Sequence, residues 1–180
     1  MAPTSSVQVQ NGATLGGSGY AQGSAKLQSG GIIAPGDSIG TLKLGSLTWD
    51  GGGKIQFDLA STNAASDHLL LDLDLTKGAP AGTFHFNFND LGATAGMTYE
   101  LIGFSSQTGF AASDFTYSSN NPSLSGVFSL SGTELDFTVT QVPEPNSLTL
   151  LLGALGAYCL FRYGKANRRR PATASLLGKE

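Results

Sequence analysis

Apolar and polar residues alternate along much of the first 140 positions of the chain. Segments with this period of two are residues 54–59, 84–88, 97–101 and 135–139. Such alternation places the apolar side chains on one face of a strand and the polar ones on the other. Turn residues such as the run 50–53, Asp-Gly-Gly-Gly, separate the segments. No segment before residue 147 repeats with a helical period, so the pattern predicts an all-β body.

One alternating segment is longer than the others. It places Leu69, Leu71, Leu73 and Leu75 opposite Asp72 and Asp74, which predicts a single strand over residues 69–76. Side chains two residues apart on a strand share a face, so each of two carboxylate pairs, Asp72/Asp74 and Glu134/Asp136, should lie on one face. A calcium site or an acid–base pair is conceivable there. An exposed polar face opposite an apolar stripe is the favoured interpretation.

The candidates for chemistry are few. His68 and His85 are the two histidines, and no nucleophile-elbow motif accompanies them. The aromatic stripe Phe84, Phe86 and Phe88 could stack on a sugar, although core packing is the favoured interpretation. The glycine runs are not followed by the Lys and Ser/Thr of a phosphate-binding loop, and we interpret them as turns. We therefore expect no enzyme, no metal and no cofactor.

The first third of the chain has a looser, glycine-rich rhythm, seen in residues 12–19 and 29–42. Glycine permits the positive φ that tight corners between short strands require. These residues, and 33–42 above all, resemble the rungs of autotransporter-like passenger β-solenoids. The resemblance implies a Gly-rich β-solenoid or β-helix-like body, with a β-sandwich-like module as the alternative. Because the pattern begins in the middle of a rung without a cap, we expect further residues to precede it.

The C-terminal segment has a different character. Residues 148–161 carry no charge and are apolar on all sides, which favours a single membrane helix over a buried helix of a soluble domain. The anchor residues are Leu148, Leu150, Leu151, Leu152, Leu155, Leu160 and Phe161. A basic cluster follows at once: Arg162, Lys165, Arg168, Arg169 and Arg170.

Charge divides the chain in the same way. Residues 1–147 hold four bases and twelve acids, whereas residues 148–180 hold six bases and one acid. The positive-inside rule then keeps the tail in the cytoplasm and the acidic body across the membrane. An acidic body with no second basic surface also argues against nucleic-acid binding. The single cysteine, Cys159, lies in the apolar run, so neither an internal disulfide nor a cysteine-based metal site is possible.

The apolar run is preceded by Pro143-Glu144-Pro145. This order of motif, apolar run and basic cluster resembles the PEP-CTERM sorting signal of bacterial envelope proteins. The resemblance implies that an exosortase, a membrane cysteine protease or transpeptidase, recognises Pro143, Glu144 and Pro145. Residues 148–161 would then be a transient anchor, and the basic cluster a stop-transfer signal. Residues 1–8 lack the basic and apolar regions of a secretory signal, which such a protein should carry. This again leads us to expect a longer chain.

The predicted organisation is a β body over residues 1–142, a sorting and anchor segment over 143–170, and a short cytoplasmic tail over 171–180. The resemblance implies a non-catalytic exported protein of the cell surface or extracellular matrix, anchored in the inner membrane until it is processed. Two alternatives remain. One is a carbohydrate-binding or polysaccharide-acting β-helix protein, with extracellular polysaccharide as its partner, and the other is a membrane-anchored β domain whose tail is never cut.

Overall fold

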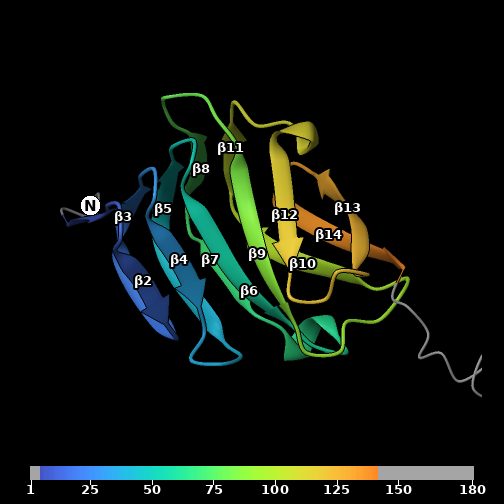
Figure 1. Cartoon of the computed structure of the whole chain (residues 1–180). Helices are drawn as coiled ribbons and strands as arrows, with labels where there is room; N and C mark the ends of the chain where they lie inside the picture. Colours follow the sequence, from blue (N-terminus) through green and yellow to red (C-terminus); the bar gives the residue numbers. More distant parts are fainter. Residues whose placement is uncertain (1–4, 142–180) are drawn as a thin grey trace, which may run out of the picture. The chain divides into compact units, whose positions relative to one another are not determined.

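The computed structural model describes residues 5–141, which form two β-sheets that face each other across one apolar core (Figure 1). The larger sheet has nine strands and the smaller has five. The helices among the described residues are two short 3-10 turns, η1 (Asn63–Ala65) and η2 (Ala112–Asp114). The all-β prediction for the body is therefore confirmed for this part of the chain.

The main path of the large sheet runs in the order β1-β3-β5-β7-β10-β14-β13, with β8 beside β5 and β11 beside β8. Its strands are β1 (Ser6–Val9), β3 (Gly19–Leu27), β5 (Thr41–Trp49), β7 (His68–Leu71), β8 (Asp74–Lys77), β10 (Thr98–Gly103), β11 (Ser106–Thr108), β13 (Ser125–Leu130) and β14 (Glu134–Gln141). The small sheet has the order β12-β9-β6-β4-β2. Its strands are β2 (Thr14–Gly17), β4 (Ile32–Pro35), β6 (Lys54–Leu59), β9 (Phe84–Asp90) and β12 (Phe115–Ser119).

Up to β12 the chain passes back and forth between the two sheets. β1, β3 and β5 lie in the large sheet, while β2, β4 and β6 lie in the small one. Neighbours within each sheet pair in parallel, as in β1–β3, β3–β5, β2–β4 and β4–β6. The last two strands differ, because β13 and β14 form an antiparallel pair and β14 is antiparallel to β10. This pair ends the large sheet on the side away from β1.

A column of glycines makes one set of turns between the sheets. Gly12, Gly30 and Gly52 all have φ between 77° and 86°, a region that side chains with a Cβ rarely adopt. The Gly12 amide donates to the Gly30 carbonyl at 3.0 Å, and the Gly30 amide donates to the Gly52 carbonyl at 3.0 Å. A Cβ on Gly30 would also lie 2.2 Å from Asn11 Oδ1. The recurring glycines in the first third of the chain are thus explained by successive turns that share one backbone conformation.

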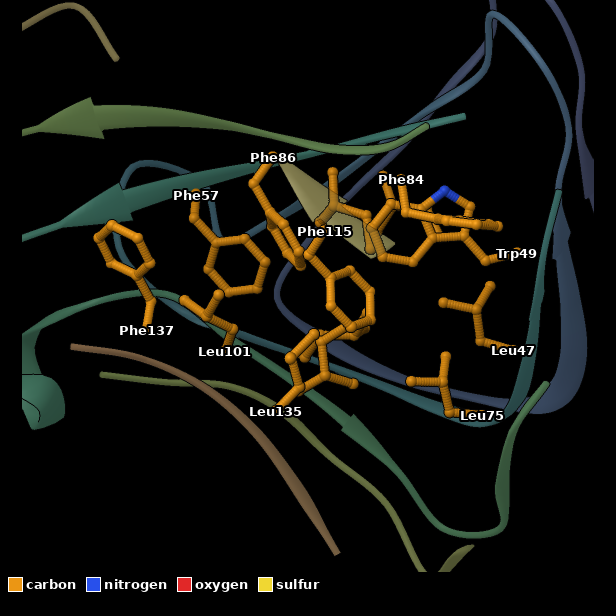
Figure 2. Packing of buried hydrophobic residues seen from close by; sticks show 14 of the residues in the cluster. Leu47, Trp49, Phe57, Leu75, Phe84, Phe86, Leu101, Phe115, Leu135 and Phe137 are labelled. Atoms are coloured by element: carbon orange, nitrogen blue, oxygen red, sulfur yellow. The ribbon is translucent and has the colours of Figure 1, made fainter. Parts of the chain in front are cut away.

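The core is rich in aromatic side chains (Figure 2). Trp49 is fully buried and meets Phe84 and Phe86 edge-to-face, with ring centroids 5.4 and 5.3 Å apart. At the other end of the cluster, Phe88 and Phe137 lie 4.7 Å apart. Edge-to-face pairs of this kind add about 0.5–1.5 kcal/mol each beyond the burial of their area. These side chains join the two sheets, since Trp49 and Phe137 come from the large sheet and the other three from the small one.

The prediction of a single strand over residues 69–76 is wrong. The segment divides into β7 and β8, and Leu73 between them is 47% exposed, although Leu69, Leu71 and Leu75 are buried. Both short strands pair with the one long strand β5. At the break, the Ser105 hydroxyl donates to the Asp72 carbonyl and the Ser105 amide donates to the Leu73 carbonyl. The Asp72 and Leu73 amides donate to the Leu44 and Gly45 carbonyls of β5, and the register to β5 shifts by one residue, from Leu44–Leu71 to Leu47–Leu75. This extra residue interrupts the alternation, so Leu73 leaves the apolar face.

None of the helices within residues 5–141 is long and apolar enough to cross a bilayer. The predicted membrane helix over residues 148–161 lies outside the described residues.

Candidate functional site: the polar face of the small sheet

The outer face of the small sheet carries polar side chains in register across three strands. The register of β6, β9 and β12 aligns Lys54 with His85 and Thr116, and Gln56 with Asn87 and Ser118. A third row joins Asp58 to Asn89 and continues to Asn120, just beyond β12. We call these nine residues the polar face. Each alternates with a core residue such as Phe57 or Phe86, so the strand period that builds the core also builds this face.

His85 lies in the middle strand of the polar face. Its Nδ1 is 2.9 Å from the Thr116 hydroxyl and its Nε2 is 3.1 Å from the Ser118 hydroxyl. Partial burial lowers the pKa of His85, and the neighbouring positive charge of Lys54 lowers it further. The lowered pKa favours the neutral form of the ring. With both nitrogens bonded to hydroxyl groups, His85 lacks the carboxylate partner that orients a catalytic histidine.

The third row is a hydrogen-bonded series of two side-chain amides and one carboxylate. Asn120 Nδ2 donates to Asn89 Oδ1 at 2.6 Å, and Asn89 Nδ2 donates to Asp58 Oδ1 at 3.0 Å. The Asp90 amide in turn donates to Asn120 Oδ1 at 2.7 Å. The polar face is therefore an ordered set of hydroxyl, amide and imidazole groups, with one positive charge at Lys54 and one carboxylate at Asp58.

The carboxylates of Asp72 and Asp74 do not form a pair. The Asp72 carboxylate accepts a hydrogen bond from the Tyr20 hydroxyl. It also forms an ion pair with Lys43 Nζ at 2.9 Å. These two partners lower the pKa of Asp72. Asp74 lies in the separate strand β8 and accepts a hydrogen bond from the Ser106 hydroxyl at 2.5 Å. The prediction that the two share one strand face is wrong, because the strand is interrupted between β7 and β8.

Glu134 and Asp136 do share β14, as predicted. The register of β10 with β14 places Glu100 opposite Asp136. Burial raises the pKa of Asp136, and the charges of Glu134 and Glu100 raise it further. Within residues 5–141 no group of three or more His, Cys, Asp and Glu side chains has a geometry that could hold a metal ion.

The remaining predicted candidates are accounted for by the fold. Phe84, Phe86 and Phe88 are at most 2% exposed, which confirms core packing over a sugar-stacking platform. His68 begins β7, where its backbone amide donates to the Gly40 carbonyl at 3.0 Å. The glycine run 50–53 is a turn, in which the Gly53 amide donates to the Asp50 carbonyl.

The predicted sorting, anchor and stop-transfer residues all lie outside the described residues. They are Pro143, Glu144, Pro145, Leu148, Leu150, Leu151, Leu152, Leu155, Leu160, Phe161, Arg162, Lys165, Arg168, Arg169 and Arg170.

No family model matches the chain, and no curated protein matches it at a significant level.

Sequence reasoning identified the polar side of β6 and of β9 but missed the polar face itself. Each strand shows its own alternation, yet nothing in the sequence states that β12 pairs with β9 in a register that aligns Thr116 with His85. The two strands are joined by a long connection through β10 and β11 in the other sheet. Local periodicity carries no signal for such a pairing.

Proposed function

We propose that this is a non-catalytic, exported protein of the bacterial cell surface or extracellular matrix, sorted by a C-terminal PEP-CTERM signal that an exosortase-type enzyme processes. The observation that carries the proposal is the order Pro143-Glu144-Pro145, uncharged run 148–161, and basic cluster 162–170. The folded body is compatible with it, because the last strand, β14, ends at Gln141, two positions before the motif.

The chemistry of the motif suits recognition by a membrane protease. Proline fixes φ and has no backbone N–H, so Pro143 and Pro145 oppose continuation of the β14 ladder and keep the motif extended. Glu144 supplies a single charge for the enzyme to recognise. Arg162 and the arginines that follow resist translocation and hold residues 148–161 in the inner membrane until cleavage.

The test is the C-terminal mass of the mature protein, isolated from the envelope and the medium of its native host. We expect a chain that ends near Pro145 and lacks the apolar segment. Pro143→Ala combined with Glu144→Gln should leave a full-length, membrane-bound protein, whereas Pro171→Ala, a proline change outside the motif, should be processed normally. A wild-type chain that ends at Glu180 and occurs only in the membrane would reject sorting and leave a permanently anchored β domain.

We further propose that the body is a β-solenoid, in which each pair of strands forms one turn of a flattened coil. The proposal is supported by the alternation of β1 to β6 between the two sheets, by the parallel pairing within each sheet, and by the column of glycine turns. Coils of this kind present long regular faces and need no catalytic centre, which suits a surface or matrix protein.

A second candidate function is the binding of extracellular polysaccharide, and the polar face favours it. Its regular hydroxyl and amide groups match the hydrogen-bonding chemistry of a neutral glycan chain. Asn87→Ala with Ser118→Ala should weaken retention of the protein on a neutral polysaccharide matrix. The matched change Ser106→Ala with Thr108→Ala, on β11 of the other sheet, should not. Equal retention of both variants would reject this function.

A further inference from the structure

The large sheet has an outer face of its own, built from five segments that share one pattern. The segments are residues 6–9, 24–27, 46–49, 74–77 and 106–109, which lie at β1, β3, β5, β8 and β11. Their sequences are Ser-Val-Gln-Val, Ser-Ala-Lys-Leu, Ser-Leu-Thr-Trp, Asp-Leu-Thr-Lys and Ser-Gln-Thr-Gly. The second residues Ala25, Leu47 and Leu75 are buried. The first and third side chains of each segment therefore point away from the core.

The pairing of the strands arranges these outward side chains in two rows. One row consists of Gln8, Lys26, Thr48, Thr76 and Thr108. The other consists of Ser6, Ser24, Ser46, Asp74 and Ser106. We call the seven hydroxyl residues of the two rows the hydroxyl face: Ser6, Ser24, Ser46, Thr48, Thr76, Ser106 and Thr108. Because paired strands lie about 4.8 Å apart, hydroxyl groups repeat along each row at this interval.

Most hydroxyl groups of this face have no partner within the described part of the chain. Of the seven, Ser106 forms a side-chain hydrogen bond, which it donates to Asp74. The polar face of the small sheet differs, because its hydroxyls at Thr116 and Ser118 are bonded to His85. The hydroxyl face therefore keeps its donors and acceptors for an external partner.

Three of the ten outward positions are not hydroxyl residues. Lys26 Nζ forms an ion pair with the Asp50 carboxylate at 3.3 Å, and the Asp74 carboxylate accepts the hydrogen bond from Ser106. The third position, Gln8, is uncharged. Both charges are thus engaged by neighbouring side chains, and the row of threonines over β5, β8 and β11 is unbroken.

The arrangement of the hydroxyl face narrows the kind of partner that it fits. Its ten outward positions include no aromatic and no large apolar side chain, so it lacks the anchors that dominate the affinity of protein interfaces. What the face offers is one small polar group repeated in two directions, across the strands and along them. A partner that is itself periodic in two directions, the surface of a crystal, matches this array best.

We propose that the hydroxyl face binds ice. Its interval across the strands is close to the repeat of oxygen atoms along the prism face of hexagonal ice. Threonine is stiff at χ1, so Thr48, Thr76 and Thr108 hold their hydroxyl and methyl groups fixed on the backbone and lose little freedom on binding. A single hydroxyl bond to ice contributes little, but hydroxyls carried on one sheet bind together, and their contributions accumulate.

The experiment measures how much of the full 180-residue protein, kept in detergent micelles, is incorporated into ice that grows slowly from the solution. We expect incorporation of wild type. Thr76→Lys should lower the incorporated fraction at least about tenfold, because a long charged side chain in the threonine row holds the crystal away from the neighbouring hydroxyls. The matched control is Thr98→Lys, an exposed position on β10 of the same sheet but outside the hydroxyl face, which should be incorporated like wild type.

Thr108→Lys, at an exposed position of β11, is the second variant and should have the same effect as Thr76→Lys. Emission of the buried Trp49 checks that each variant folds. Three results would overturn the proposal: wild type excluded from ice as completely as empty micelles, incorporation that neither Thr76→Lys nor Thr108→Lys lowers, or binding to crystalline cellulose that both variants abolish without any incorporation into ice. The last would show that the face binds a glycan. The inference does not depend on sorting of the tail.

Discussion

Asp67 links the two sheets through hydrogen bonds. It is 3% exposed, and its two carboxylate oxygens accept hydrogen bonds from Gly40 at 2.9 Å and from Asp58 at 2.7 Å. Gly40 precedes β5 of the large sheet, whereas Asp58 belongs to β6 of the small sheet. Burial raises the pKa of Asp67 to about 6, although the two backbone hydrogen bonds oppose this change and the charge of Asp58 adds to it.

The raised pKa predicts a specific pH dependence. The folded state binds the Asp67 proton more tightly than the unfolded state, so the group's contribution to stability is complete below about pH 4 and is lost as pH rises to about 6. The difference in unfolding free energy between wild type and Asp67→Asn should therefore decrease over this range. The decrease should reach at most about 3 kcal/mol, since a tenfold change in proton affinity corresponds to about 1.4 kcal/mol.

Chemical denaturation at pH 4, 5, 6 and 7 measures this difference. Asp37→Asn, an exposed aspartate in the loop before β5, is the control and should show no comparable trend. If the unfolding free energy of wild type relative to Asp67→Asn increased between pH 4 and pH 6, the argument would be contradicted. Such an increase would mean that folding favours the ionised form of Asp67 over the protonated form.

At the level of elements, the first strands repeat one unit. In the large sheet Ser6 aligns with Ser24, which aligns with Ser46, and in the small sheet Thr14 aligns with Ile32, which aligns with Lys54. Ser18 and Thr41 are also equivalent, since each precedes one of the aligned residues Gly19 and Leu42. Each unit contacts mainly its neighbours, so a whole unit is removable in principle.

Deletion of residues 18–40 removes β3 and β4 and joins Gly17 to Thr41 with the natural spacing between β2 and β3. The variant should fold, with Trp49 buried and a cooperative thermal transition at a lower temperature. The midpoint falls because core residues such as Leu27 and Ile33 are lost.

The control is deletion of residues 24–35, which removes half of β3 and all of β4 and leaves an incomplete unit. We expect no cooperative unfolding from it. If both deletions unfold the protein equally, the units are not modular and the coil description of the body is wrong.

At the scale of the whole molecule, one continuous apolar cluster joins both sheets. Its members run from Val9 near the start of the described chain to Val139 in β14. The last strand is essential to it, because Leu135, Phe137 and Val139 are all fully buried. Among the described residues its last member, Val139, lies four positions before the Pro143-Glu144-Pro145 motif.

Removal of the tail should therefore leave the body intact. A protein that ends at Pro145, the product expected from sorting, should have the same thermal midpoint as the full chain in the same detergent. A protein that ends at Ser131 lacks β14 and should not fold, since it loses three buried side chains that cost about 2–5 kcal/mol each. Circular dichroism measures both, and a large loss of stability in the first protein would show that the tail supports the body.

Several features of the body could be predicted from single segments. The alternation in β6, β9 and β14 gave the correct buried faces, because a half-buried strand must alternate. The same logic failed at Leu73, where the register to β5 shifts by one residue and interrupts the strand. Ser105, over thirty positions away, donates hydrogen bonds to the backbone at this break. Trp49 was not singled out, since a lone tryptophan carries no period, yet it is a centre of the aromatic core.

The sequence by itself determined the all-β character of the body, the buried side of most strands, and the proposed sorting role of the tail. These depend on local period, turn residues and charge order, which act over a few neighbouring positions. Only the tertiary structure decided which strands lie side by side, and with that the polar face and the two-sheet link through Asp67. Each depends on parallel pairing between segments far apart in the chain, and such pairing depends on how the whole core packs.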